Sequence, residues 1–379
     1  MATPSDMTRN CACGGTVYQS DLGKKSLSCR RLLCAGRPTR SGSQAYRQPT
    51  TAVEDFAIGE HISMQTVSII GCGYTGLRLA KRWLSRGARV RGFATRPKSL
   101  RDIAGAGAEA IELNLDVAPL PLDFDGQLVY YTVPPAPIGR RDERLKRLLD
   151  HLVGKPMRFV YLSTTGVYGN RNGERVDEEA IPAPQSERAF RRLAAESALR
   201  GWADKCKVSW CILRVPGIYG PDRLPLERLW RGDPTLLPEE ATPGNRIHVD
   251  DLVTACIAAG VTARADRRIY NVTDGSSDSL TDYLQRVARI SNLPSPPLIR
   301  LSEAERLLSA RAWSLLGESR RVDNKRMLGE LGITLAYSDL DAGIRASLNR
   351  RGTDISINSC RCAIPHGIAQ KTSGPRDLG

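Results

Sequence analysis

The stretch of residues 67–80 constrains the fold of this chain more than any other. A short apolar, β-branched run leads into Gly-Cys-Gly-Tyr-Thr-Gly at residues 71–76, and an apolar pattern of helical period follows. In such a strand–turn–helix context, Gly71 permits a tight turn, Gly73 lets a pyrophosphate approach the backbone, and Gly76 lets the helix pack closely on the strand. The start of the new helix offers free N–H groups and a positive dipole end to the phosphates. We therefore expect a dinucleotide-binding turn that consists of Gly71, Cys72, Gly73, Tyr74, Thr75 and Gly76.

Strand and helix patterns alternate from residue 64 onward. The expected strands are residues 66–70, 89–94, 109–113, 128–133, 158–163, 208–215 and 268–272. The expected helices are residues 75–86, a segment after Pro97, and residues 140–153, 186–205, 249–260, 280–291, 323–331 and 338–349. β-Branched strands that alternate with helices indicate a parallel sheet covered on both faces. We predict an α/β protein with a doubly wound parallel (Rossmann) sheet within residues 64–345, and a small C-terminal substrate lobe mainly from residues 217–247 and 290–345.

The two ends of the chain show no sustained period. Residues 1–63 are rich in Ser, Thr, Arg and Gly and lack the apolar run of a secretory signal. We expect a disordered leader there, or a start of translation at Met64. An organelle transit peptide is the alternative, although these residues are more acidic than such peptides usually are. Residues 346–379 are expected to form an irregular tail.

The composition argues against a nucleic-acid-binding protein and against a membrane-spanning one. The 379 residues carry a formal net charge of +14, but the basic residues are scattered along helices and form no Lys/Arg block. This pattern argues against a specific nucleic-acid partner, and no apolar run approaches the roughly 18 residues of a membrane helix. Six of the ten cysteines lie in the two ends of the chain, and the four in the middle have no paired spacing. No Cys-x-x-Cys and no matching His pattern is present, so we expect no metal site and no disulfide framework. We expect reduced, mostly buried thiols in a cytoplasmic protein, with organelle import as the alternative.

The end of the second expected strand bears on the choice of cofactor. In Rossmann units an acid about 20 residues after the glycines binds the ribose hydroxyls of NAD, whereas an Arg there suits the 2′-phosphate of NADP. No acid stands at that point here, but Arg96 and Lys98 do, so we expect NADP rather than NAD. Asp116 could bond the adenine, and the backbone that leaves the fourth strand could line the cofactor. Beyond the glycine turn, the expected cofactor residues are Thr95, Arg96, Lys98, Asp116, Val133 and Pro134.

Five further segments resemble one known family. They are Leu-Ser-Thr-Thr-Gly-Val-Tyr-Gly at 162–169, Leu-Arg-Val-Pro-Gly-Ile-Tyr-Gly-Pro at 213–221, Ile-His-Val-Asp-Asp-Leu at 247–252, Tyr-Asn-Val at 270–272 and Arg-Arg-Val-Asp-Asn-Lys-Arg at 320–326. In this order they resemble the extended short-chain dehydrogenase/reductases, specifically the NAD-dependent epimerase/dehydratase family. The Gly-x-Gly-x-x-Gly spacing is tighter than the family's usual Gly-x-x-Gly-x-x-Gly and is similar to that of atypical, sugar-nucleotide epimerase-like members. The resemblance implies an NAD(P)-dependent oxidoreductase or isomerase for a nucleotide-sugar-like or other hydroxylated small-molecule substrate.

The resemblance also assigns the family's catalytic positions. The family uses a Ser/Thr that orients the substrate, a Tyr that moves a proton, and a Lys four residues later that binds the nicotinamide ribose and lowers the pKa of the Tyr. Thr164 stands at the first position, but Arg188 takes the place of the Tyr and Arg192 that of the Lys. A guanidinium has no usable deprotonated form near neutrality, so Arg188 cannot act as the base, whereas Arg192 could still bond the ribose. Two ordinary arginines on a solvated helix, or ligands of an anionic substrate, are the other interpretations.

Two functions therefore stay open. One is an enzyme of this family in which an unidentified group moves the proton, and the other is a catalytically silent dinucleotide-binding sensor or assembly protein. The resemblance further implies a homodimer through the helices at 140–153 and 186–205. His248 with Asp250 and Asp251 has the composition of a catalytic or metal pair. That segment is similar to a structural turn of the family, in which one of the two aspartates caps the following helix.

Overall fold

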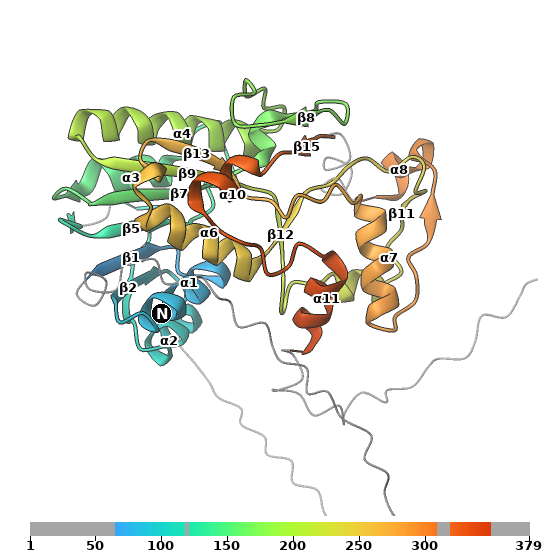
Figure 1. The fold of residues 1–379 in the computed structure, drawn as a ribbon, viewed down its shortest axis with the longest axis horizontal. Helices are drawn as coiled ribbons and strands as arrows, with labels where there is room; N and C mark the ends of the chain where they lie inside the picture. The colour runs from blue at the N-terminus through green and yellow to red at the C-terminus, as the bar shows by residue number, and fades with distance from the viewer. Residues whose placement is uncertain (1–64, 118–120, 309–318, 350–379) are drawn as a thin grey trace, which may run out of the picture. The chain divides into compact units, whose positions relative to one another are not determined.

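The computed structural model describes residues 65–117, 121–308 and 319–349, which all belong to one unit of the chain, residues 49–379. The expected leader, residues 1–63, and the part of the expected tail beyond residue 349 lie outside the described residues. A sheet between two layers of helices forms the larger part of the described chain, and a smaller lobe lies beside it (Figure 1). No helix among these residues is long and apolar enough to cross a membrane.

A sheet of seven parallel strands confirms the predicted doubly wound architecture. In spatial order the strands are β13 (Arg268–Asn271), β9 (Ser209–Val215), β7 (Arg158–Thr164), β5 (Leu128–Tyr131), β1 (Thr66–Ile70), β2 (Arg89–Ala94) and β3 (Glu109–Glu112). Val67 of β1 pairs in register with Val90 of β2 and with Leu128 of β5. The chain runs outward from β1 to β3 and then returns to β5 on the other side of β1, so the strand order reverses between β1 and β5. Open α/β sheets bind their ligands at such a reversal, outside the carboxyl ends of the strands.

Helices cover both faces of the sheet. One face carries α1 (Tyr74–Leu84), α2 (Pro97–Gly105), α6 (Val249–Val261) and α10 (Lys325–Leu331), and the other carries α3 (Glu143–His151) and α4 (Glu187–Cys206). Successive residues of β1 enter different cores, since Ile69 packs with the first set of helices and Ile70 with the second. Burial on both faces explains why the strand sequences are almost continuously apolar.

The smaller lobe has a core of its own. It is enclosed by α5 (Leu226–Trp230), α7 (Leu280–Ile290) and α11 (Leu340–Asn349), and Tyr219, Leu284 and Ile344 are among its buried side chains. The packing differs from the expected lobe ranges in two helices. α7 contributes to the lobe core although it ends at residue 290, and α10 packs against the sheet although it lies within 290–345.

The remaining elements are short and have no sequence period of their own. They are the strand pairs β10 (Gly217–Tyr219) with β12 (Arg246–His248), β11 (Thr235–Leu236) with β14 (Leu298–Ile299), β8 (Arg175–Val176) with β15 (Arg321–Val322) and β4 (Leu122–Asp123) with β6 (Leu152–Val153), the 3-10 turns η2 (Thr165–Tyr168) and η3 (Ala263–Ala265), and the helix α8 (Leu301–Leu307). Longer elements shift slightly at their ends. The helix expected at 140–153 begins at Glu143, because Asp142 caps it by accepting a hydrogen bond from Leu145 N at 3.1 Å.

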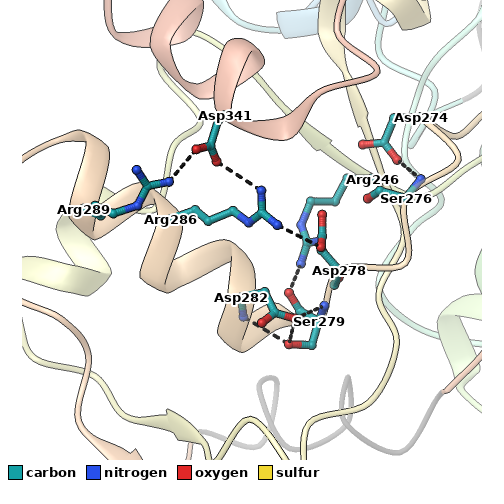
Figure 2. Close-up of polar contacts among 9 residues, drawn as sticks. All are labelled: Arg246, Asp274, Ser276, Asp278, Ser279, Asp282, Arg286, Arg289 and Asp341. Carbon is teal, nitrogen blue, oxygen red and sulfur yellow. Dashed lines mark hydrogen bonds and ion pairs between the residues drawn. The ribbon is translucent and has the colours of Figure 1, made fainter.

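Ion pairs join α11, the last helix of the described chain, to α7 within the lobe. Figure 2 shows Asp341 of α11 between Arg286 and Arg289 of α7. Arg286 Nη1 lies 3.2 Å from Asp341 Oδ1, and Arg289 pairs with the other oxygen of that carboxylate. Arg286 also lies 3.4 Å from Asp278, in the loop before α7. The two arginines are therefore already engaged by carboxylates within the lobe.

The structure corrects the expected cap of α6. The position before the first helical residue belongs to His248, whose Nδ1 accepts a hydrogen bond from Asp250 N at 3.2 Å. Asp251 is instead directed to a distant segment, where its carboxylate accepts from Ala336 N at 2.8 Å and from Tyr337 N at 3.0 Å. A side chain of α6 thus fixes the backbone that leads into α11.

Candidate cofactor and active site

The glycine turn connects β1 to α1. Gly71 has a φ of +88°, and the N–H groups of Gly71 and Cys72 donate to Phe93 O, at the end of β2, at 3.0 and 2.8 Å. A Cβ on Gly71 would lie 2.8 Å from the backbone N of Val133, so only glycine fits this position without a shift of the backbone. A Cβ on Gly76 would lie 3.1 Å from Gly71 O, which shows how closely the helix approaches the strand.

The space beside the Cα of Gly73 is open, although the Gly73 N–H itself donates to Gly71 O at 2.6 Å. Among the described residues, a Cβ there would meet only Gly71 O, at 3.8 Å. Helix α1 then begins at Tyr74 with neither a side-chain cap nor an acid in its first turn. Its first N–H groups therefore lack helical acceptors and present the positive end of the dipole. Thr75 and Cys72 are buried beneath the turn, and burial raises the pKa of the Cys72 thiol to about 12, so this thiol packs rather than reacts.

The segment after β5 forms a wall beside the turn. Thr132 N donates to Ile70 O at 2.9 Å, and Thr132 Oγ1 donates to Gly71 O at 2.7 Å. These bonds end the strand at Tyr131, earlier than the expected residue 133. Val133 follows against Gly71, and Pro134 is exposed. The structure therefore brings the glycine turn and the expected wall residues together at the carboxyl edge of the sheet.

The end of β2 carries exposed polar side chains on the same edge. Thr95, Arg96 and Lys98 are all exposed. Lys98 Nζ lies 2.8 Å from Asp102, one turn along α2. The side chain of Arg96 makes no hydrogen bond or ion pair with any other residue that the structure describes. Of the two bases expected to bind the cofactor, Arg96 alone keeps its donors unused within this part of the chain.

Asp116 is engaged by a neighbouring helix. Its two carboxylate oxygens accept hydrogen bonds from Arg144 of α3, both at 2.6 Å. Arg144 also donates to Pro134 O at 3.0 Å. The hydrogen-bonded guanidinium holds the pKa of Asp116 below its usual range. Asp116 thus fixes the wall at Pro134 through Arg144, and both of its oxygens are already used in doing so.

Thr164 ends β7 at the same edge of the sheet. Its Oγ1 accepts a hydrogen bond from Gly166 N at 3.2 Å and caps η2. Tyr168, the last residue of η2, is fully buried, and burial raises the pKa of its phenol. The Tyr168 hydroxyl donates to Asn271 Oδ1 at 2.8 Å and accepts from Arg214 Nη1 at 3.0 Å. This phenol is therefore committed to the core.

The two arginines at the family's Tyr and Lys positions differ in their surroundings. Arg192 Nη1 donates to Leu162 O at 3.0 Å and to Tyr161 OH at 3.1 Å. The same nitrogen lies 3.4 Å from Val133 O, so the side chain reaches the wall beside the glycine turn. Arg188, one turn earlier on α4, is exposed.

A buried network that the sequence does not predict lies behind these residues. Glu196 of α4 receives two hydrogen bonds from Arg214 of β9, at 2.8 and 3.1 Å, and the side chains are only 2% and 3% exposed. Ser163 Oγ donates to Glu196 at 2.6 Å. The network anchors the end of β7 to α4 and β9. Its sequence signal is the four-residue spacing from Arg188 to Arg192 to Glu196, which places all three on one helix face.

Two surface hollows lie away from the predicted site residues. One of about 620 Å³ runs along α7, and another of about 500 Å³ adjoins residues 170–173 and 239–243. In the first hollow, Arg286 and Arg289 are already paired with Asp341 (Figure 2). Neither hollow is lined by a predicted site residue, so the candidate site remains the carboxyl edge of the sheet.

Comparison with known proteins gives relatives that span most of the chain. The sequence model of the NAD dependent epimerase/dehydratase family matches residues 145–273. Protein YeeZ from Escherichia coli (strain K12) is 26% identical over 288 residues, which cover 73% of this chain and 97% of that protein. A functionally unknown conserved protein from Silicibacter pomeroyi DSS has a similar structure, with 28% identity, a TM-score of 0.65, and coverage of 76% of this chain and 99% of that chain.

A further solved structure shares the fold at lower identity. UDP-glucuronic acid 4-epimerase from Bacillus cereus, in complex with NAD, is 16% identical with a TM-score of 0.59, over 75% of this chain and 96% of that chain. The matched residues 145–273 contain four of the five family-like segments, including those of η2, β9 and β12. The matched segments and the seven-stranded parallel sheet agree with one another. Over residues 145–273 the chain is similar to the NAD dependent epimerase/dehydratase family.

Proposed function

We propose that the protein binds NADP at the glycine turn and is an NAD(P)-dependent oxidoreductase or epimerase for a nucleotide-sugar-like or other hydroxylated small molecule. The observation that carries the proposal is the uncapped start of α1, with open space beside Gly73, at the reversal of strand order. A diphosphate needs such a cradle of backbone N–H groups. The relatives support the class of ligand, since the epimerase from Bacillus cereus was solved with NAD and with UDP-glucuronic acid and NAD.

Arg96 supports NADP over NAD. The residues from Thr95 to Lys98 include no acid that could accept hydrogen bonds from the ribose hydroxyls. The Arg96 guanidinium is exposed and is not engaged by any other described residue. A guanidinium donates to a phosphate through two parallel N–H groups, which suits the 2′-phosphate.

The neighbouring side chains limit the chemistry. Bound NADP would supply or accept the hydride at nicotinamide C4. Thr164 Oγ1 accepts from Gly166 N, so its own proton remains available to orient a substrate oxygen. Arg192 makes all its protein hydrogen bonds among the described residues through Nη1, which leaves Nε and Nη2 for ribose hydroxyls. Arg188 stays charged near neutrality, so it stabilises an anionic group and accepts no proton.

A dinucleotide-binding protein without turnover is the second candidate function. It is favoured by the arginines at the Tyr and Lys positions, and by the engagement of the Tyr168 hydroxyl with Asn271 and Arg214. We expect the double substitution Arg188→Tyr, Arg192→Lys to change NADPH affinity by less than tenfold, about 1.4 kcal/mol, because the turn and the wall make most cofactor contacts. Substrate turnover is measured beside it. Turnover by the wild-type protein would rule out this second candidate, and a larger loss of affinity would make the arginines major cofactor ligands.

The direct test is a titration of the full chain with NADPH and NADH, followed by nicotinamide fluorescence. We expect micromolar binding of NADPH, about −8 kcal/mol, and at least tenfold weaker binding of NADH. Arg96→Gln should remove the difference between the two nucleotides. Lys98→Gln removes the same charge from a side chain already paired with Asp102, so it serves as the matched control. Absence of binding by either nucleotide would overturn the proposal, and equal binding would overturn its NADP part.

We also propose a homodimer through α3 and α4, and a cytoplasmic location. The two helices pack on the same face of the sheet, and the outer side of α4 exposes the small residues Ser197, Ala198 and Gly201, where another helix can approach. Sedimentation equilibrium should give a dimer, and Gly201→Trp should shift it to monomer. A wild-type monomer at tens of micromolar would contradict the dimer.

The four described cysteines are free, which suits a reducing compartment such as the cytoplasm. Cell fractionation tests the location.

A further inference from the structure

Two arginines contact the ring of Tyr74, the first residue of α1. The guanidinium carbon of Arg78 lies 3.9 Å from the ring centroid of Tyr74, and that of Arg223 lies 4.0 Å from the same centroid. Both guanidiniums therefore lie against the ring of Tyr74. Arg78 belongs to α1 itself, whereas Arg223 follows β10 in the loop that leads to α5. Cation–π attraction therefore links the glycine turn to a loop of the lobe.

Backbone contacts fix this loop against the turn. Tyr74 OH donates to Pro221 O at 2.8 Å. Gly220 has a φ of +150°, and a Cβ there would lie 2.8 Å from Tyr74 OH and 2.7 Å from Val249 Cγ1. Only glycine fits so close an approach. The glycine turn thus holds the loop that carries Arg223 in place.

Neither guanidinium uses all of its N–H donors in hydrogen bonds within the described residues. Arg78 donates to Tyr74 O at 3.0 Å and lies 3.9 Å from the exposed carboxylate of Asp222. Arg223 has no hydrogen bond or ion pair from its side chain within the described residues. Partial burial, with a smaller contribution from Arg78, lowers the pKa of Arg223, which shows that its positive charge is poorly compensated. An anion that bound here would meet unused charge-assisted donors beside the unpaired N–H groups of α1.

We propose that Arg78 and Arg223, held on the ring of Tyr74, form an anion subsite that takes a phosphate of the bound ligand. The proposal rests on the proposed function, because it places this phosphate next to the glycine turn. The chemistry is that of a diphosphate, which either the dinucleotide or a nucleoside-diphosphate substrate carries. Because Arg223 belongs to the lobe loop and Arg78 to α1, a phosphate held by both connects the lobe to the sheet when the ligand is bound.

The test compares Arg78→Gln and Arg223→Gln with the wild-type full chain by calorimetry, with NADPH and uridine diphosphate as separate probes. Arg231→Gln is the control, since this arginine lies in the same region and loses the same charge but is already paired with Glu227 and Asp233. We expect each of the two variants to weaken at least one probe tenfold or more, and the control to change it less than threefold. Thermal unfolding of each variant checks that the fold is kept.

The pattern of losses identifies the source of the phosphate. A loss confined to NADPH assigns the subsite to the cofactor, and a loss confined to uridine diphosphate assigns it to the substrate. Variants that bind both probes as the control does would overturn the subsite while leaving the proposed cofactor site intact. If the wild-type chain binds uridine diphosphate but not NADPH, the proposed function fails and the subsite is still tested by the second probe. Binding of neither probe overturns both proposals.

Discussion

Glu196 and Arg214 are buried charged residues. The free-energy cost of burying the two charges is offset only by their ion pair and by their hydrogen bonds. Removing one partner of such a pair leaves an uncompensated charge, which typically costs about 3–5 kcal/mol. We therefore expect Glu196→Gln to lower the free energy of urea unfolding by about 3 kcal/mol, and the double substitution with Arg214→Met to recover part of the loss. Glu187→Gln is the control, because Glu187 pairs with Arg140 at an exposed site and should cost less than about 1 kcal/mol. Equal losses at the two sites would contradict this account.

Asp274 is a buried carboxyl whose protonation depends on pH. One oxygen accepts from Ser276 N at 2.9 Å, and the other has no partner among the described residues. Burial raises its pKa to about 6, although Arg246 acts in the opposite direction. In the unfolded chain, the carboxyl of an aspartate has a pKa of about 3.9. Between these two values the folded state keeps a proton that the unfolded state loses, so the stability of the fold falls as pH rises through this window.

Substitution of Asp274 by Asn removes this titration. We expect Asp274→Asn to be more stable than the wild type at pH 7.5, by about 1–3 kcal/mol, and the advantage to shrink towards pH 4. Urea unfolding at both pH values measures the difference. Because the amide oxygen can still accept from Ser276 N, the loss of charge is the main change. An advantage that stays constant with pH would show that the carboxyl does not titrate as its burial implies.

At the scale of elements, the turn from β1 into α1 depends on close backbone approach more than on backbone conformation. Gly71 and Gly107 have the same φ of +88°, but a Cβ would clash with Val133 N at Gly71 and would meet nothing within 4 Å at Gly107. We expect Gly107→Ala to cost about 1 kcal/mol from left-handed strain alone. Gly71→Ala should cost about 1–3 kcal/mol more and weaken NADPH binding. Thermal unfolding and fluorescence titration measure the two effects, and equal costs would rule out the close approach as their cause.

The sequence predicts those elements whose own pattern determines them. β2 is found at the predicted residues 89–94 and α1 within two residues of its predicted ends, because an apolar strand between turn residues and an amphipathic helix each bury a face of their own. The two-residue strands and the bond of Asp251 to Ala336 are not predicted, since each depends on a partner far along the chain. The same distinction holds at the site. The glycine turn is a local motif, whereas the contact of Arg192 with Leu162 O exists only after α4 packs on β7.

At the scale of the whole described unit, the lobe is attached to the sheet by contacts that converge on α11 and the segment before it. Asp251 of α6 holds the backbone of Ala336 and Tyr337, and His248 Nε2 lies 3.3 Å from Ser347 Oγ of α11. On the lobe side, Asp341 engages α7 (Figure 2). α11 therefore connects the layer of α6 to the lobe, and the strength of its attachment to α7 bears on how firmly the lobe is held.

The ion pairs of Asp341 should stabilise α11 locally rather than the fold globally. Its partners Arg286 and Arg289 are 39% and 60% exposed, and exposed pairs contribute about 0–1 kcal/mol each. We expect Asp341→Asn to lower the free energy of unfolding by no more than about 1–2 kcal/mol, while hydrogen exchange in α11 accelerates clearly. Glu305→Gln on exposed α8 is the control, and it should leave exchange in α11 unchanged. NADPH affinity should stay within about threefold, because the glycine turn contacts neither helix through these groups. Exchange in α11 that matches the control would show that its other contacts, at Ser347 and at Tyr337, are sufficient to hold the helix in place.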